Sequence, residues 1–244
     1  MSVAPMPSSW GGTVRPRGRP RRRNLKDDIA THIRDLVFAA ELRPGMRVDQ
    51  DAVAAELGVS KLPVREALIV LEAEGLIVTR PSRGSFVAEL TPEDFHDTYL
   101  AVGQISAVSA RRAAMRITDA QLDELRALTE QMQAPAGVLD GDSHHRFHRT
   151  INLLGGSRRL NRVLRSLANA VPERLHYESR GGALGVAGEH AEMLAALTAR
   201  DPDRAAAAAL AHFAGGAGHA VELLAERGFW RGVPDPGHRP TEET

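Results

Sequence analysis

The stretch Asp142–Arg149, DSHHRFHR, holds three histidines within five residues, in a chain of 244 residues with ten histidines in all. In a helix, His144 and His148 lie on one face because they are four residues apart, whereas His145 is turned away by about 100°. We therefore expect His145 at the surface. Two imidazoles one turn apart can bind one metal ion together, so the spacing predicts a ligand pair at His144 and His148.

Two further histidines lie in stretches with helical periodicity, His190 in GEHAEML and His212 in LAHFAG. Both stand beside apolar residues, where an imidazole needs a polar partner, so both are candidate ligands for the same ion. Imidazole suits zinc, nickel, copper or iron, whereas magnesium and calcium prefer oxygen. The alternative is that each histidine is a polar core or surface residue. His219 shares the face of His212 and is an outside candidate.

The chain has no cysteine, which excludes disulfides, thiolate catalysis and cysteine-type zinc sites and suits a reducing compartment. The start of the chain, MSVAPMPSSWGG, lacks the apolar core of a secretory signal. No apolar run approaches the ~20 residues that a membrane-spanning helix needs. We therefore expect a cytoplasmic protein with no membrane partner.

The net charge is zero but unevenly distributed. Residues 1–90 carry 14 Lys and Arg against 11 Asp and Glu, whereas residues 91–244 carry 17 against 20. A basic front predicts a polyanion partner. Residues 1–23, rich in Pro, Gly, Ser and Arg, should form a disordered arm. Its RPRGRPRRR run is either a solvated tail or an arm that follows DNA phosphates, and RGRP resembles an AT-hook core.

The pattern after this arm predicts a winged helix-turn-helix over residues 24–90. Asn24 can cap a first helix that starts at Leu25. A second helix over 50–57 and a third over 61–74 are joined by a short turn at Gly58, the helix-turn-helix arrangement. The β-prone stretches 76–80 and 84–90 flank Pro81–Gly84 and predict a hairpin wing with a basic tip.

From Thr91 onward the sequence predicts helices only, so the chain is mainly α, with an all-helical antiparallel bundle over residues 91–228. The Thr-Pro-Glu-Asp stretch Thr91–Asp94 is a typical helix start. The expected helices cover residues 93–116, 119–133, 140–154, 158–178, 186–199 and 202–227. Pro172 should kink the fourth of them. Residues 229–244 should be a loose tail.

These segments resemble a known family. Residues 41–90, with LGVS, PVREAL, LEAEGL and RGSFV, resemble the DNA-binding domain of GntR-family transcriptional regulators. The helical part, with FH at 147–148, EH at 189–190 and AHF at 211–213, resembles the FCD effector domain of the FadR subfamily. The two resemblances together cover roughly residues 24–228.

The resemblance implies that the third helix enters the major groove and that the wing tip lies at the adjacent minor groove. It places DNA contacts on Lys61, Leu62, Pro63, Arg65, Arg83 and Gly84. Arg65 is the best candidate for a base contact, because a guanidinium can bond bidentately to guanine. The alternative for Arg65 is a surface salt bridge with Glu66 or Glu72.

Two departures from the family bear on the operator sequence. Many members have Arg-Thr where this chain has Lys61-Leu62, and Leu62 cannot donate a hydrogen bond. Some members carry Arg where this chain has Asp51, whose charge would repel phosphate.

The FCD resemblance also implies a metal site. Many such domains hold a divalent ion with one Asp and three histidines, and His148, His190 and His212 match the three histidines. His144 stands where the family has the Asp, which predicts a four-histidine set for a divalent transition metal, with zinc or nickel suiting it best. Asp142, two residues upstream, is a further candidate ligand, although it faces another direction.

A further departure concerns the effector. FCD domains often carry an Arg and an acid near the effector pocket, and this chain has Val102 and Ser106 there. The usual inference of an organic acid is therefore weakened, although Arg112 or Arg174 could substitute for the missing Arg.

We expect a ligand-responsive DNA-binding regulator, more often a repressor in such families, which reads a palindromic operator as a homodimer. A small-molecule effector and the metal would bind in the helical bundle. One alternative is a DNA-binding regulator whose helical domain only dimerises. Another is an enzyme with a metal-activated water, but Glu189 is the only acid adjacent to these histidines and no HExxH spacing exists.

Overall fold

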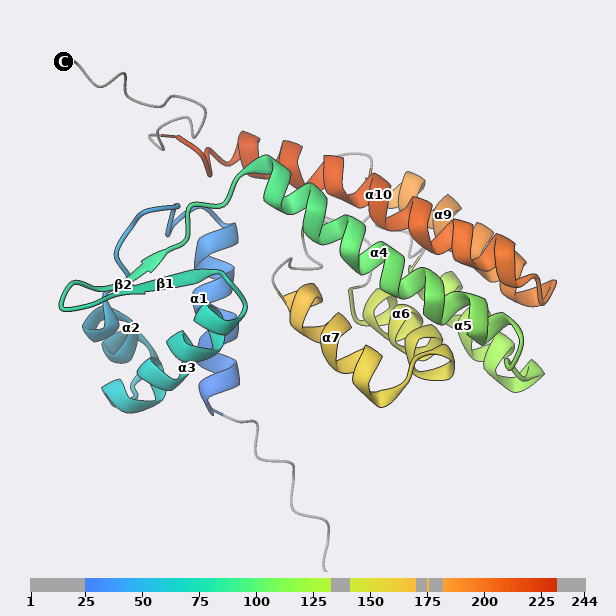
Figure 1. The fold of residues 1–244 in the computed structure, drawn as a ribbon, viewed down its shortest axis with the longest axis horizontal. Helices are drawn as coiled ribbons and strands as arrows, with labels where there is room; N and C mark the ends of the chain where they lie inside the picture. Colours follow the sequence, from blue (N-terminus) through green and yellow to red (C-terminus); the bar gives the residue numbers. More distant parts are fainter. Residues whose placement is uncertain (1–24, 133–140, 170–174, 176–181, 232–244) are drawn as a thin grey trace, which may run out of the picture.

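Three short helices followed by a two-stranded hairpin form the N-terminal domain (Figure 1). The structure is a computed structural model that describes residues 25–132, 141–169, 175 and 182–231, with only the backbone for 182–187. The helices are α1 (Leu25–Phe38), α2 (Gln50–Leu57) and α3 (Lys61–Ala73). The strands β1 (Ile77–Arg80) and β2 (Gly84–Val87) pair antiparallel. The predicted winged helix-turn-helix is confirmed.

Local backbone chemistry defines the turn between α2 and α3. The Asp49 carboxylate caps α2 by accepting hydrogen bonds from the N–H groups of Asp51 (2.9 Å) and Ala52 (3.1 Å). These bonds, that of Ala52 first, hold the pKa of Asp49 below its ordinary value. The ionised Asp49 cap therefore stabilises the fold fully at pH values above the ordinary pKa of an aspartate. This stabilisation is lost as the pH falls through the lowered pKa of Asp49. Gly58 ends α2 at φ +64°, a conformation that favours glycine.

The regular elements described in the C-terminal domain are all helices. It consists of α4 (Pro92–Ala114), α5 (Asp119–Met132), α6 (Gly141–Gly155), α7 (Arg158–Asn169), α9 (Gly182–Thr198) and α10 (Pro202–Glu226). A capping box starts α4: the Thr91 hydroxyl accepts from the Asp94 N–H, and the Thr91 N–H donates to the Asp94 carboxylate. The two longest helices, α4 and α10, lie side by side along most of their length (Figure 1). The predicted mainly α class is confirmed.

Glycines allow two close approaches to α4. A Cβ atom at Gly155, the end of α6, would lie 1.8 Å from the Ser109 carbonyl oxygen of α4. A Cβ atom at Gly103 of α4 would lie 3.1 Å from the Cβ of Phe213 in α10. Any larger residue at Gly155 would force α6 away from α4. The glycine therefore helps to set the depth of α6, the helix that carries His144.

The predicted helices differ from the structure in two places. The helix expected over 158–178 is described only over Arg158–Asn169 and at Leu175. The helix expected over 186–199 begins at Gly182 instead. Glycines at 182, 185 and 188 lower the intrinsic helix propensity of this stretch, so the predicted start of the helix was too late. The basic arm, the Asn24 cap and the kink expected at Pro172 lie outside the described residues.

An aromatic cluster, here called the interdomain seam, joins the two domains. Phe229, which follows α10, is fully buried and stacks on Phe38 at the end of α1, with ring centroids 6.4 Å apart. Phe95 of α4 packs edge-on against Phe229 at 6.0 Å. The Trp230 indole N–H donates to the Leu90 carbonyl between the domains at 2.7 Å. Helix α10 is thereby tied to the N-terminal domain.

The seam corrects one expectation. The tail predicted to be loose from residue 229 onward is packed at Phe229 and Trp230, because two adjacent aromatic side chains bury apolar area between the domains. A polar contact reinforces the same junction: the Arg227 guanidinium donates to the Phe38 carbonyl at 2.9 Å. The helical domain therefore extends beyond residue 228.

We predict that Phe229→Ala lowers the free energy of unfolding by about 3–5 kcal/mol, the usual cost of truncating a buried phenylalanine. Urea denaturation followed by circular dichroism measures it. Leu153→Ala is the control, because Leu153 is 57% exposed and its loss should change little. An unfolding midpoint of Phe229→Ala equal to that of Leu153→Ala would contradict the role of the seam.

Candidate metal centre and nucleic-acid interface

Four histidines from three helices meet inside the C-terminal domain. Helix α6 supplies His144 and His148, α9 supplies His190 and α10 supplies His212. All four are buried, with exposed fractions between 1% and 8%. One ring nitrogen of each lies within 4.8 Å of those of the other three. The tertiary structure thus brings together all four of the metal ligands predicted from the sequence.

The spacing of these nitrogens fits a metal ion. The Nε2 atoms of His148 and His190 are 2.9 Å apart, and the ring centroids of His190 and His212 are 4.6 Å apart. Because Zn–N bonds are about 2.0–2.1 Å, two nitrogens on one ion lie roughly 2.9–3.4 Å apart at octahedral to tetrahedral angles. The cluster therefore needs only small ring movements to enclose an ion, and its neutral nitrogen donors suit a transition metal.

A carboxylate lies directly behind one of the four rings. Glu189 Oε2 is 2.8 Å from the Nδ1 of His212, across the contact between α9 and α10. The sequence analysis weighed Glu189 only as a base for an enzyme, because nothing in the spacing of residues 189 and 212 indicates a contact. The only feature of the sequence that could have pointed to Glu189 is that it stands next to the candidate ligand His190.

The remaining histidine predictions can be placed as well. His145 is exposed, as its helical position predicted. His219 is only partly buried and does not belong to the described four-histidine group. Asp142, two residues before His144, is exposed. Val102 and Ser106, at the positions where the family carries its Arg and acid, are both buried.

The exposed face of α3 carries the predicted DNA contacts. Leu62 is 65% exposed, and Arg65 lies beside it with its Nε 3.4 Å from the Gln50 side-chain oxygen. Arg65 is not paired with Glu72 in the structure, since Glu72 accepts hydrogen bonds from the backbone and hydroxyl of Thr79. The Arg65 guanidinium is therefore held only weakly and faces solvent.

The Lys61 ammonium lies 2.5 Å from the Asp51 carboxylate at the start of α2. Sequence reasoning treated Asp51 only as a group that would repel phosphate. The structure adds that Asp51 neutralises the first basic side chain of α3. The two effects act in the same direction, because both make the surface less attractive to a phosphate.

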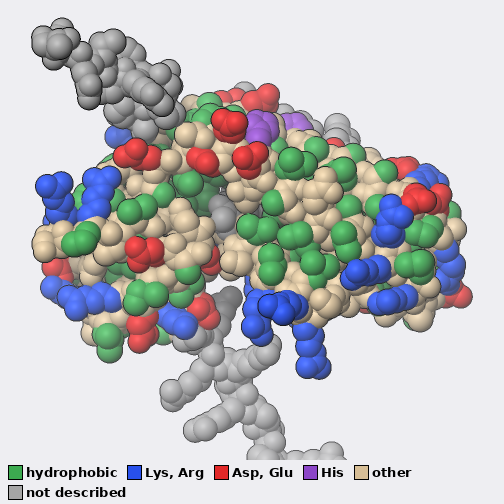
Figure 2. Space-filling view, viewed as in Figure 1, with side chains coloured by type: hydrophobic (Ala, Val, Ile, Leu, Met, Phe, Trp, Pro, Cys, Tyr) green, Lys and Arg blue, Asp and Glu red, His purple; other side chains and the backbone are tan. Residues whose placement is uncertain are grey.

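The wing tip supplies a second basic group of side chains. Arg83 is exposed and Gly84 adopts φ +102°. The Arg47 guanidinium packs against Gly84, where a Cβ atom would lie 3.1 Å from its Nε. Arg47 was missed by the sequence analysis, since it lies far from the wing in the chain. In Figure 2, Lys and Arg side chains gather along the outer edge of the N-terminal domain.

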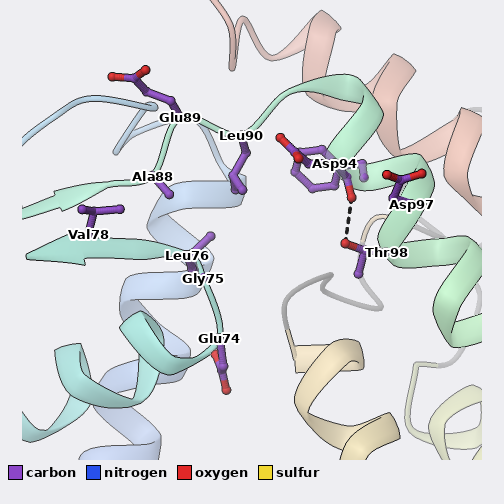
Figure 3. A pocket seen from close by; sticks show the side chains of 11 residues that line it. Glu74, Gly75, Leu76, Val78, Ala88, Glu89, Leu90, Asp94, Asp97 and Thr98 are labelled. Carbon is purple, nitrogen blue, oxygen red and sulfur yellow. Dashed lines mark hydrogen bonds between the residues drawn. The ribbon is translucent and has the colours of Figure 1, made fainter.

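A separate cavity of about 490 Å³ lies between the hairpin and the first turns of α4 (Figure 3). Four acids line it: Glu74, Glu89, Asp94 and Asp97. Its acidic lining repels phosphates and carboxylates, and none of the four histidines lines it. This cavity therefore contains none of the candidate metal ligands and none of the predicted DNA contacts.

Comparison with protein families agrees with this architecture. Residues 25–87 match the family described as bacterial regulatory proteins, gntR family, and residues 97–215 match the FCD domain. The chain therefore belongs to the gntR family of DNA-binding transcriptional regulators and carries an FCD effector-binding domain. Its relatives are regulators, so the enzyme alternative is excluded.

Individual relatives carry the same description. The chain is 28% identical to an HTH-type transcriptional regulator of Mycobacterium tuberculosis over 186 residues. The match covers 76% of each of the two chains. It is 35% identical over 100 residues to the HTH-type transcriptional repressor RspR of Escherichia coli, covering 41% of this chain and 43% of RspR. The solved structure of E. coli McbR/YncC has the same fold, with a TM-score of 0.64 at 22% identity over 83% of this chain and 98% of that one. Among the described helices, none is long and apolar enough to cross a membrane.

We predict that Asp51→Asn strengthens DNA binding about two- to fivefold at low salt, the worth of a released surface ion pair. The substitution frees the Lys61 ammonium for a phosphate and removes a repelling charge. Fluorescence anisotropy with a labelled duplex measures it. Asp123→Asn is the matched control, because Asp123 pairs with Arg126 on the helical domain at 2.6 Å. Equal affinities for the two variants would contradict the prediction.

Proposed function

We propose that the protein is a metal-dependent, effector-responsive regulator that binds a palindromic operator as a homodimer and represses transcription in the cytoplasm, at the nucleoid. The observation that carries this proposal is the buried four-histidine cluster in the FCD domain. An isolated buried histidine is ordinarily a core residue with a polar partner. Four within reach of one point form a donor set.

The donor set favours zinc or nickel. Four neutral imidazoles bring no charge, so an ion that prefers nitrogen is favoured over one that prefers carboxylate oxygen. A bound ion would supply a cross-link between α6, α9 and α10 and a positive charge at their junction. The usual Arg and acid for a carboxylate effector are absent at Val102 and Ser106. The small-molecule effector would therefore be recognised by the metal centre and not by an arginine at these two positions.

A physical path connects the metal centre with the DNA-binding domain. Phe213, next to His212, belongs to the same hydrophobic cluster as Phe229 and Phe38. A ligand that draws α6, α9 and α10 together would act on α10, whose end is held in the interdomain seam. Such a ligand shifts the orientation of the DNA-binding domain only if it binds two arrangements with different affinities.

The proposed DNA contacts lie on α3 and on the wing. Two recognition helices related by a two-fold axis would read the two halves of a palindrome. In each half, Arg65 would read a base, Lys61 a base or a phosphate, and Arg83 and Gly84 the wing-side groove. Leu62 and Pro63, which have no donor side chain, would contact the groove through apolar atoms. The relative RspR, named as a repressor, supports repression as the outcome.

Metal content tests the site. We predict that the untagged protein holds about one equivalent of a transition metal and that the His148→Ala, His190→Ala double variant holds none. Elemental mass spectrometry measures both, and thermal unfolding should show a higher Tm with metal in the wild type but not in the double variant. His145→Ala is the control, because His145 lies on the same helix but is exposed.

Absence of metal from the wild type, even after incubation with zinc and with nickel, would sink the metal site. A regulator whose helical domain only dimerises would then be the better description.

Base recognition gives a second test. We predict that Arg65→Ala loses about 1–3 kcal/mol of binding to the preferred duplex, with relaxed preference at one base pair, as expected for a bidentate guanine contact. Selection from a random duplex pool followed by anisotropy measures both quantities. Arg111→Ala, on the helical domain, is the control. A uniform loss on all duplexes would assign Arg65 to a phosphate instead.

A further inference from the structure

We propose that Glu189 is a positioning residue that holds His212 in the orientation and tautomer needed to bind the metal. This inference rests on the metal site proposed above. It concerns a residue outside the ligand set, contributed by a different helix from the ligand that it holds. The geometry that carries it is the 2.8 Å contact between Glu189 Oε2 and His212 Nδ1.

The chemistry of the contact determines which nitrogen of His212 can bind the metal. A carboxylate is only an acceptor, so the Nδ1 of His212 must carry the hydrogen of this bond. In a neutral imidazole the other nitrogen, Nε2, then holds its lone pair. That nitrogen is itself fully buried. Glu189 thus leaves His212 with its lone pair on the atom that faces away from the carboxylate.

The position of Glu189 on α9 lets it contact His212 of α10 while the adjacent His190 faces the metal site. Glu189 and His190 are adjacent on α9, so their side chains diverge by about 100°. His190 is 1% exposed within the cluster, whereas the Glu189 side chain is 35% exposed at the contact with α10. Gly215 of α10 makes room for it, since a Cβ atom there would lie 3.0 Å from Glu189 Oε1.

This arrangement has a general physical effect on a metal ligand. A carboxylate that accepts from the distal N–H of a ligating histidine fixes the ring and raises the basicity of the ligating nitrogen. Removing such a partner typically weakens metal binding 10- to 100-fold. The other three ligands are unchanged by the loss, so binding should weaken rather than disappear.

The experiment compares three variants of the full chain. Zinc dissociation constants are measured by competition with a chromophoric chelator. We expect Glu189→Ala to bind zinc about 10- to 100-fold more weakly than the wild type. Glu189→Gln keeps an acceptor oxygen without the charge, so its loss should be smaller. Glu189 is partly exposed, so none of these changes removes a core side chain.

Glu192→Ala is the matched control. Glu192 lies one turn further along α9 and also reaches α10, where it accepts from the Arg204 Nε at 2.7 Å and from the Arg204 Nη2 at 2.8 Å. Its loss removes an ion pair between the same two helices without touching a histidine. A merely structural role for Glu189 would make the two alanine variants alike, whereas a positioning role predicts that only Glu189→Ala weakens zinc binding.

A spectroscopic measurement completes the test. Long-range ¹H–¹⁵N correlation of the imidazoles in the metal-free protein should place the His212 proton on Nδ1 in the wild type and in Glu192→Ala, and should move it in Glu189→Ala. An unchanged zinc dissociation constant in Glu189→Ala overturns the inference and leaves the metal site standing. A wild type that binds no zinc overturns the metal site itself, and the two failures are therefore distinguishable.

Discussion

The burial of four imidazole rings at the junction of α6, α9 and α10 is the constraint on which the helical domain depends. Polar ring nitrogens that leave water need partners, and an interior of Ala, Leu and Phe side chains provides few. The ring nitrogens therefore have to hydrogen-bond to one another or to the Glu189 carboxylate, or bind an ion. Each solution requires that α6, α9 and α10 keep the relative positions that bring the ring nitrogens within 4.8 Å of one another. The close glycine contact of Gly155 with α4 fits that requirement.

Helix α10 links the chemistry to the rest of the molecule. It carries His212 near its middle and leads into Phe229, which is buried against Phe38 and Phe95 in the interdomain seam. One rigid element thus touches both the candidate metal centre and the end of α1. A change of ligand state in the bundle can reach the DNA-binding domain through these packed apolar contacts.

Acidic side chains reduce the positive charge of the surface that carries the predicted DNA contacts. The Asp51 carboxylate neutralises Lys61, and the acid-lined cavity, which begins at Glu74 just after the end of α3, contains none of the predicted DNA contacts. Positive charge remains where a duplex would need it, at Arg65 and at the wing tip with Arg47 and Arg83. With the proposed contacts, part of the sequence-independent attraction to phosphate would be lost in this way, and base contacts would supply a larger share of the binding energy.

The sequence by itself determined most of the secondary structure, because caps, glycine turns and apolar periodicity act within a few residues. The Thr91 capping box, the Gly58 turn and the shared face of His144 and His148 are local in this sense. Helical periodicity beside apolar residues made His190 and His212 candidate ligands, and the family resemblance placed all four histidines in one site. Only the tertiary structure decided that Glu189 meets His212, that Asp51 meets Lys61 and that Phe229 is buried. These pairs join separate helices, and their contacts depend on interhelical positions that no local pattern encodes.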